Sequence, residues 1–561
     1  MFFETLDFRH PFVYNEINYF YHKEVHQMNT NYQHFGVMLD MSRNAVMKVG
    51  EVKKMIDCLQ IMGYNTLELY TEDTYEIAGE PHFGYLRGRY TGAEIKEIDA
   101  YAKAHGIELI PCVQTLAHFT ALSRYNEYSE IFDLQDILLI DEPKTYAFID
   151  KIFATIAENF TSRLVNIGMD EAHMVGLGKY LKKHGYQDRY EMLIRHLSKV
   201  AEIAKKYGFK AHMWSDMFFR LGSGGNYYAP ELEIPESVKQ CLPENVELTY
   251  WDYYHNEKSI YDGMIKRHQE FGKDVWFAGG AWCWYGFAPL AKFSFQTMKP
   301  AMESVREHGV KNVIITMWGD NGKECSFFSL LHALYAIRQY ADGNFEQEKI
   351  EKGFYNLFKI RYADFMLLDL PNYRDFNAEL KGAENPCKSL LYTDPFLGWL
   401  DNAVAKNRPI PYAQYAERLK KAKKSAGELA YIFEQLEKLC SVLAIKATLG
   451  VKTRKAYQSG DRKALAPIIK EYSELKKRLI TFHEVHYALW HKENKPQGWE
   501  IQDARIGGLI QRVETCKKRL KLYVAGKLDK IEELEEEILP YGDGDTMIFA
   551  WYDKLVSTSI L

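Results

Sequence analysis

The sequence predicts an α/β fold: a (β/α)8 TIM barrel followed by a C-terminal α-helical domain. Three observations lead to this prediction. Short apolar runs alternate with amphipathic stretches from about residue 35 to 340, no phosphate-binding glycine motif follows any run, and the remaining residues show only helical periodicity. The chain has 561 residues, more than one hydrophobic core normally supports, so we expect more than one domain.

Eight apolar runs, each bounded by polar residues or glycine, have the composition of strands buried on both faces. Helical patterns such as 51–62 and 188–207 separate the runs, and parallel strands require crossover helices of this kind. Eight strand–helix units in this length fit a closed barrel. The runs are 36–40, 65–70, 107–113, 164–168, 210–214, 246–251, 274–278 and 312–317.

A doubly wound open sheet is the alternative fold. Such sheets usually bind a nucleotide through a glycine-rich turn after a strand. No G-x-G-x-x-G or P-loop follows any of the eight runs, and the GSGG at 222–225 matches neither pattern. The sequence therefore favours the barrel.

The C-terminal part shows the spacing of buried helix faces. One series runs from Leu429 through Leu436 to Leu443, and a second runs from Ile506 to Leu520. We therefore predict three parts, with the segment before the helices connecting them to the barrel. These are an N-terminal extension packing on the barrel at 1–34, the catalytic barrel at 35–342, and the connecting segment with the helical domain at 343–561.

Composition limits the class of partner and the compartment. The formal net charge is -5 and no sustained basic block is present, which argues against nucleic acid and anionic membranes as partners. No apolar stretch approaches the ~20 residues that span a bilayer, and the N-terminal residues do not resemble a secretory signal. We expect a cytoplasmic protein, a monomer or homodimer.

Cysteine and histidine spacing predicts no metal and no other cofactor. The 8 cysteines are scattered without a C-x-x-C pair, which argues against a zinc ribbon and a disulfide framework. His483, His486 and His491 invite a metal interpretation, but zincin-type helices place two histidines at i and i+4, whereas His483 and His486 stand at i and i+3.

Candidate functional residues follow the predicted strands, because the active site of such a barrel forms at the C-terminal ends of its strands. Every strand end contributes polar or aromatic residues, and the second half of the ring is rich in tryptophan. The residues are Asp40, Ser42, Arg43, Glu72, Asp73, His118, Asp170, Glu171, Trp214, Asp216, Trp251, Asp252, Tyr253, Tyr254, Trp282, Trp284, Trp318 and Asp320.

Tryptophans and carboxylates around one pocket indicate a carbohydrate site. Indole faces can cover the C–H faces of a pyranose, and glycoside cleavage needs an acid near the leaving oxygen and a negative or nucleophilic group near the anomeric carbon. Asp170 and Glu171 supply two adjacent carboxylates after the fourth strand. Consecutive side chains on a strand point to opposite faces, so we expect the two to act on different groups of one substrate.

Four segments together resemble glycoside hydrolase family 20, the β-N-acetylhexosaminidases. VNIGMDEAHMVGLGKY resembles the family's fourth-strand signature, and GVMLDMSRNAV its first-strand segment. PCVQTLAHF resembles the third-strand segment that ends in histidine, and MWGD the last-strand Trp-x-acid. The absence of a front domain and the helical C-terminal part resemble the cytoplasmic bacterial branch.

The resemblance implies a retaining exo-enzyme that removes terminal β-linked GlcNAc or GalNAc from glycans and glycoconjugates. The substrate's own acetamido oxygen would attack the anomeric carbon and form an oxazolinium-type intermediate. Glu171 would be the acid and then the base, and Asp170 would hold the acetamido N–H. The substrate-binding residues implied or favoured are Arg43, Asp73, His118, Trp214, Trp251, Asp252, Tyr254, Trp282, Trp318 and Asp320.

Several alternatives stay open at this level. Tyr250 or Tyr253 can replace Tyr254 as the acetamido-binding tyrosine, and Glu72 can replace Asp73 as the second-strand carboxylate. A different barrel β-glycosidase would carry a protein nucleophile, for example Asp320, roughly 5 Å from the acid. A non-catalytic sugar-binding protein would keep the pocket without the reaction.

Overall fold

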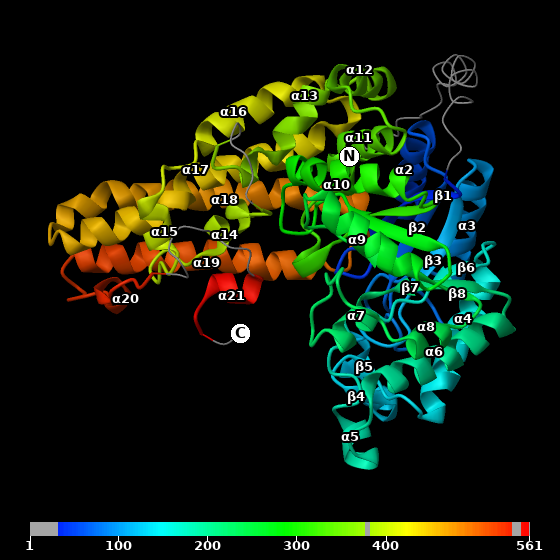
Figure 1. Ribbon diagram of the computed structural model, residues 1–561. Coiled ribbons are helices and arrows are strands. Elements are labelled where there is room, and N and C mark those ends of the chain that lie inside the picture. The colour runs from blue at the N-terminus through cyan, green and yellow to red at the C-terminus, as the bar shows by residue number, and fades with distance from the viewer. Residues whose placement is uncertain (1–31, 376–381, 541–550, 560–561) are drawn as a thin grey trace, which may run out of the picture.

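Eight parallel strands close into a barrel in the computed structural model, which describes residues 32–375, 382–540 and 551–559 (Figure 1). Around the barrel the strands follow the order β1, β10, β9, β8, β7, β6, β3, β2. The barrel strands are β1 (His34–Asp40), β2 (Thr66–Thr71), β3 (Glu108–Val113), β6 (Leu164–Asn166), β7 (Lys210–Trp214), β8 (Val246–Trp251), β9 (Val275–Gly280) and β10 (Asn312–Met317).

Helices cover the outside of the barrel and bury the outer faces of its strands. Thr91 and Glu94 form a reciprocal capping box that fixes the start of one of them, α3. The covering helices are α2 (Val49–Ile61), α3 (Gly92–Ala104), α4 (Pro143–Asn159), α6 (Arg189–Lys206), α9 (Lys258–Gln269), α10 (Ala291–Glu307) and α11 (Leu331–Ala341). Three shorter helices lie in connections between strands: α5 (Lys179–His184) after β6, and α7 (Asp216–Gly222) and α8 (Glu236–Gln240) after β7. A small antiparallel pair, β4 (Phe132–Leu134) and β5 (Ile137–Leu138), lies in the long loop after β3.

Polar side chains fill part of the barrel interior and lie close to one another there. His212 Nε2 lies 3.2 Å from Glu68 Oε1, and both side chains are buried. The ring of Trp276 stacks on His212 with centroids 4.1 Å apart, and Trp276 Nε1 donates a hydrogen bond to Glu247. Because buried polar groups need such partners, this layer makes the interior a packed core.

The C-terminal part is helical and extends away from the barrel (Figure 1). Helices α16, α17, α18 and α19 pack against one another in sequence order. The two predicted helical series lie on α17 and α19. The helices are α12 (Gln347–Phe358), α13 (Tyr362–Phe365), α14 (Pro386–Tyr392), α15 (Asp401–Lys406), α16 (Tyr412–Ala422), α17 (Ala430–Gln458), α18 (Leu465–Glu493), α19 (Trp499–Val524), α20 (Glu532–Glu535) and α21 (Tyr552–Val556).

A buried ion cluster joins the helical part to the barrel. Glu324 lies in the loop after β10, and its carboxylate contacts Lys388 Nζ of α14 at 2.8 Å and Arg505 of α19 at 3.0 Å. Lys388 and Arg505 also donate to the carbonyl oxygen of Asn321 in the same loop. Two helices therefore fix the conformation of the loop that follows the last barrel strand.

The predicted fold class is confirmed: each of the eight apolar runs contains or overlaps one barrel strand, and the C-terminal part is helical. The predicted domain boundaries stay predictions. Residues 1–31 of the expected N-terminal extension lie outside the described residues, and β1 already begins at His34. Along the described ranges, the structure holds no helix whose length and apolar character would suffice to span a bilayer.

Replacement of Lys388 by methionine should destabilise the protein markedly. The change removes one of the two cations that neutralise the buried Glu324 carboxylate, and loss of one partner of a buried ion pair costs about 3 kcal/mol. Thermal unfolding should show an apparent Tm several degrees lower. Lys349→Met removes an exposed ion pair to Glu346 and serves as the control. Equal shifts for the two variants would contradict the role of the cluster.

Candidate active site

A cavity of about 260 Å³ opens at the C-terminal ends of the barrel strands. It is the size of a single amino sugar and mixes charged groups with aromatic walls, as small-molecule sites do. Nine of the twelve residues predicted for the site line it. The lining consists of Arg43, His118, Asp170, Glu171, Trp214, Trp251, Tyr253, Tyr254, Trp284, Tyr285, Trp318, Asp320 and Trp551.

The backbone after β6 turns sharply and brings both carboxylates to this one cavity. Strand β6 ends at Asn166, and Gly168, Met169 and Glu171 have φ values of 70°, 69° and 52°. A Cβ at Gly168 would lie 2.1 Å from the Gln114 amide oxygen, so only glycine fits there. Asp170 and Glu171 therefore stand beyond the strand, and the expected alternation of strand faces does not separate them.

The Asp170 carboxylate is buried and held from two sides. Gln114 Nε2 donates to Asp170 Oδ1 at 2.8 Å, and His118 Nε2 lies 3.1 Å from Asp170 Oδ2. Burial alone would raise the pKa of Asp170, but the His118 charge and these contacts lower it below its usual value. Burial lowers the pKa of His118, yet the Asp170 charge outweighs burial and raises it to about 9. The pair is a carboxylate and an imidazolium at neutral pH.

Glu171 points to the open side of the cavity, with its side chain 47% exposed. Its backbone N–H donates to Asp216 Oδ2 at 3.1 Å, and Arg220 also donates to that oxygen at 3.2 Å. Burial and the nearby Asp170 charge raise the pKa of Asp216 to about 7. Asp216 therefore anchors the backbone of Glu171 from beneath the cavity.

Arg43 joins the first and last strand ends of the barrel. Its guanidinium contacts Glu72 Oε1 at 3.1 Å and Asp320 Oδ1 at 3.1 Å. Enclosure by the cavity walls raises the pKa of Asp320 to about 6, although the Arg43 charge partly offsets this effect. The three side chains place fixed donors and acceptors at one wall, where they can bind sugar hydroxyls.

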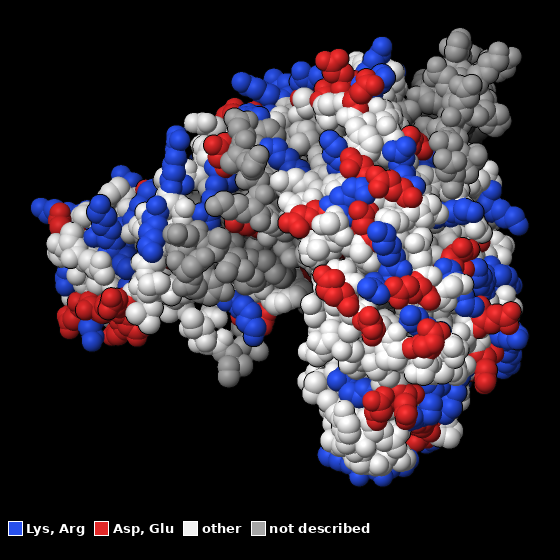
Figure 2. Space-filling view, in the orientation of Figure 1, with Lys and Arg blue, Asp and Glu red and all other residues white. Residues whose placement is uncertain are grey.

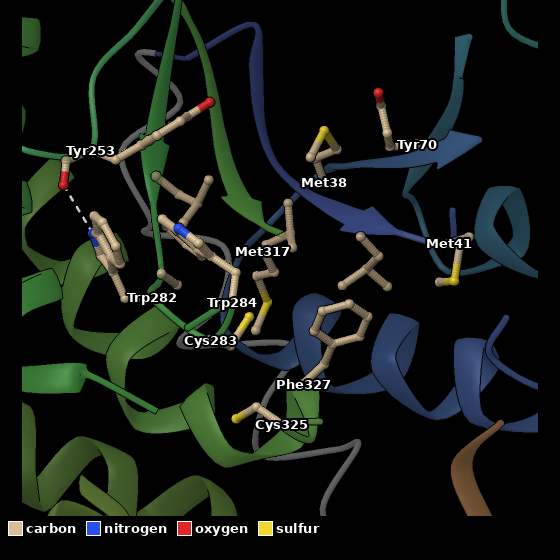
Figure 3. Close-up of a cluster of buried hydrophobic side chains, with 14 of the residues drawn as sticks. Met38, Met41, Tyr70, Tyr253, Trp282, Cys283, Trp284, Met317, Cys325 and Phe327 are labelled. Carbon is tan, nitrogen blue, oxygen red and sulfur yellow. Dashed lines mark hydrogen bonds between the residues drawn. The ribbon is translucent and has the colours of Figure 1, made fainter. Parts of the chain in front are cut away.

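Aromatic rings form the remaining walls and pack in two layers. Trp214 and Trp251 are buried and line the cavity together with Trp318. Trp284 lines it as well, and Trp282 stacks behind Trp284 with centroids 4.0 Å apart (Figure 3). The indole N–H of Trp282 donates to the carbonyl oxygen of Tyr253 at 2.9 Å, so Trp282 supports the wall from behind.

Three predicted substrate-binding residues do not line the cavity, and their role in binding stays a prediction. Asp73 turns to Arg87, whose Nε donates to it at 3.0 Å. Asp252 is buried and accepts from the Tyr250 hydroxyl, and it also contacts the His255 imidazole at 2.8 Å. The third is Trp282, which the wall of Trp284 separates from the cavity. Of the two second-strand carboxylates, only Glu72 contacts Arg43.

Some residues of the site were not among those predicted for it. Tyr253 was only an alternative to Tyr254, and Trp284 follows a predicted strand but received no role. Tyr285 stands one residue beyond the last tryptophan considered after the seventh strand, and Gln114 lies directly after the third strand. A window one residue wider would have included Tyr285, whereas Gln114 already lay within the window and was not selected. Trp551 follows no barrel strand, so no strand-end rule can find it.

The helix α18 histidines have contacts of their own. His483 Nε2 lies 2.7 Å from Asp503, and His486 is buried against Phe482 and Trp499. Across the ranges that the structure describes, no group of three or more His, Cys, Asp or Glu side chains is arranged to hold a metal ion.

The barrel and its sugar-sized cavity define the chain as a (β/α)8 protein with a strand-end site of carboxylates and tryptophans. The family model "Glycosyl hydrolase family 20, catalytic domain" matches residues 32–264, and the model "Glycoside Hydrolase 20C C-terminal domain" matches residues 363–548. The chain belongs to glycoside hydrolase family 20, as the sequence motifs predicted.

Relatives are similar over part of their length only. A β-hexosaminidase of Akkermansia muciniphila is 23% identical over 252 residues, 38% of this chain and 49% of that protein. Hexosaminidase D of Homo sapiens is 24% identical over 234 residues, which are 40% of this chain and 46% of that protein. The chain thus spans about half the length of these relatives. A crystal structure of a Vibrio harveyi exo-β-N-acetylglucosaminidase superimposes with a TM-score of 0.45 at 16% identity, covering 62% of this chain and 60% of that one.

The His118–Asp170 pair should make stability depend on pH. The pKa of His118 rises from 6.5 to about 9 on folding, so the stabilisation is complete below pH 6.5 and is lost as the pH rises through 9. It amounts to at most about 3 kcal/mol. The Tm deficit of His118→Gln relative to wild type should be large at pH 6 and small above pH 9.5. A deficit that does not change with pH would disprove the charged pair.

Proposed function

We propose that the protein is a retaining exo-β-N-acetylhexosaminidase that hydrolyses terminal, non-reducing β-linked GlcNAc or GalNAc. The observation that carries the proposal is the buried Asp170 carboxylate, held by Gln114 and His118, with Glu171 beside it at the open side of the same cavity. Family membership and the names of the similar proteins support this assignment.

In the first step, Glu171 donates a proton to the glycosidic oxygen. The acetamido oxygen of the substrate attacks the anomeric carbon, the bond to the leaving group breaks, and the alcohol departs. The product of this step is an oxazolinium-type ion, whose positive charge is shared with the nitrogen. Asp170 accepts a hydrogen bond from that N–H and stabilises the charge.

In the second step, the Glu171 carboxylate removes a proton from water. The water oxygen attacks the anomeric carbon from the face that the leaving group vacated, and the bond between the anomeric carbon and the acetamido oxygen breaks. The acetamido group is restored and the anomeric configuration is retained. Two inversions at one carbon therefore give net retention without a protein nucleophile.

The contacts of Asp170 suit it to this electrostatic role. Gln114 and His118 fix both carboxylate oxygens and keep the pKa of the group low, so Asp170 stays ionised while the positive charge develops. Asp320 is the carboxylate that a protein-nucleophile mechanism would use. Its contact with Arg43 supports a role in binding sugar hydroxyls instead.

The remaining cavity residues would bind and orient the terminal sugar. Arg43 and Asp320 would contact hydroxyls remote from the anomeric carbon, and the tryptophans would cover the apolar ring faces. Tyr254 remains our proposal for the acetamido-binding tyrosine, and Tyr285 is the second candidate because it also lines the cavity.

The partners that we propose are glycans and glycoconjugates with terminal β-linked GlcNAc or GalNAc. We also propose a cytoplasmic location. All eight cysteines are unpaired, and six of them are buried in the core, as is usual in a reducing compartment. The expected monomer or homodimer stays a prediction.

Removal of the acetamido group from the substrate should nearly abolish cleavage. Without the neighbouring oxygen the reaction loses its intramolecular nucleophile, so kcat/KM for an aryl β-glucoside should be at least about 10³-fold lower than for the matching aryl β-N-acetylglucosaminide. Similar rates for the two would favour a protein nucleophile. A wild type that releases no sugar from either would favour a sugar-binding protein.

Two variants serve as controls in this comparison. Glu171→Gln should lower kcat/KM by roughly 10²–10⁴-fold on a disaccharide and by less on an aryl glycoside, because a good leaving group needs little protonation. Asp170→Asn should lower the rate on both the disaccharide and the aryl glycoside, because the Asp170 carboxylate acts on the acetamido group rather than on the leaving oxygen.

Glu72 and Asp73 should differ sharply in their effect on activity, although they are adjacent. Glu72→Gln weakens the carboxylate that orients Arg43, so KM should rise roughly tenfold, which corresponds to about 1.4 kcal/mol. Asp73→Asn acts on Arg87, which does not line this cavity, and should leave kcat/KM for methyl β-N-acetylglucosaminide within about twofold. A larger effect of Asp73→Asn than of Glu72→Gln would instead support Asp73, the residue chosen from the sequence.

A further inference from the structure

The C-terminal segment of the chain places a tryptophan at the barrel cavity. Trp551 lines the cavity, although it precedes α21 and lies more than 200 residues beyond the last barrel strand. We propose that Trp551 forms the binding wall for the leaving group, the unit attached to the reducing side of the terminal amino sugar. This inference rests on the proposed hexosaminidase function.

Several contacts fix the segment that carries Trp551. The backbone N–H of Tyr552 donates to Asn321 Oδ1 at 3.1 Å, and the Arg505 guanidinium lies 4.7 Å from the Tyr552 ring centroid. Farther along α21, Leu555 is fully buried and its carbonyl oxygen accepts from the Trp399 indole. Asn321 directly follows Asp320, so the segment is attached to the loop that supplies the cavity wall.

The shape of the molecule agrees with this placement. Helix α21 lies beside α19 on the side that faces the lower part of the barrel (Figure 1), and the space-filling view shows the surface hollowed between the helical part and the barrel (Figure 2). The segment that begins with Trp551 therefore lies where the helical part meets the barrel.

Exposure distinguishes the inner part of the cavity from its mouth. Trp214 and Trp284 are 1% and 3% exposed and line the inner part. Glu171, with a 47% exposed side chain, stands at the mouth together with Tyr254 and Trp551, which are 45% and 40% exposed. A sugar that fills the cavity must send its leaving group out through the mouth. Because Glu171 protonates the oxygen of that group, Trp551 shares the mouth with the scissile bond.

The structure also has space for a second sugar beside Trp551. An adjoining hollow of about 400 Å³ shares Arg43, His118 and Trp551 with the cavity and continues over Thr120 and Arg505. An indole face suits the C–H face of a pyranose, and Arg124, which also lines the hollow, can donate to its hydroxyls. The preferred substrates are therefore glycans in which a second pyranose ring, rather than a compact alcohol, is attached to the terminal amino sugar.

The experiment compares two substrates that differ only in the leaving group, a β-linked GlcNAc disaccharide and methyl β-N-acetylglucosaminide. Trp551→Ala should lower kcat/KM for the disaccharide roughly tenfold and for the methyl glycoside less than twofold. Competitive inhibition by free GlcNAc, which occupies only the inner cavity, should not change. Trp551→Phe should recover part of the loss because it keeps an aromatic face.

Tyr355→Ala is the matched control, since Tyr355 is an exposed aromatic residue on α12 that does not line the cavity; it should leave both substrates unchanged. The inference would be overturned if Trp551→Ala lowered kcat/KM equally for both substrates, weakened inhibition by GlcNAc, or caused no loss at all. Each of these results would leave the proposed function intact. A wild type that cleaves neither substrate would overturn the proposed function and the inference with it.

Discussion

Closure of the barrel between β1 and β10 is the constraint on which the site depends. The two strands pair in parallel register from His34 with Asn312 to Leu39 with Met317. This pairing brings Arg43 to Asp320 although 277 residues separate them. Without closure, the wall formed by Arg43 and Asp320 would be divided between the two edges of an open sheet. The buried Glu324 cluster then fixes the loop after β10, so the helical part stabilises the geometry that closure creates.

Burial of Asp170 imposes a second requirement. An isolated carboxylate at this depth would take up a proton, because desolvation disfavours the charged form. The cation on His118 and the amide of Gln114 prevent this, and they do so from the third strand end, next to the strand that carries Asp170. A carboxylate that stays ionised at this depth therefore needs a partner cation close by.

Much of the fold could be predicted because buried parallel strands are short, apolar and evenly spaced along the chain. The site was predictable to the extent that its residues follow those strands. Glu72 and Asp73 show the limit of the method, since they are neighbours and only the direction of the loop decides which one reaches Arg43. Trp551 shows another limit: its position depends on tertiary contacts of α21 with Asn321 and Trp399, which no local pattern encodes.

The backbone around the two carboxylates shows how the protein prepares the reaction. Met169 and Glu171 adopt left-handed conformations, and such residues persist only where surrounding contacts hold them. Gln114 accepts from the N–H of Met169, and Asp216 accepts from the N–H of Glu171, so each unusual residue has its own side-chain anchor. If the nucleophile belongs to the substrate, the protein contributes position and charge. A turn that is held rigid before the substrate arrives needs no reorganisation during the reaction. Electrostatic catalysis lowers the activation barrier in this way, because the stabilising groups are already in place.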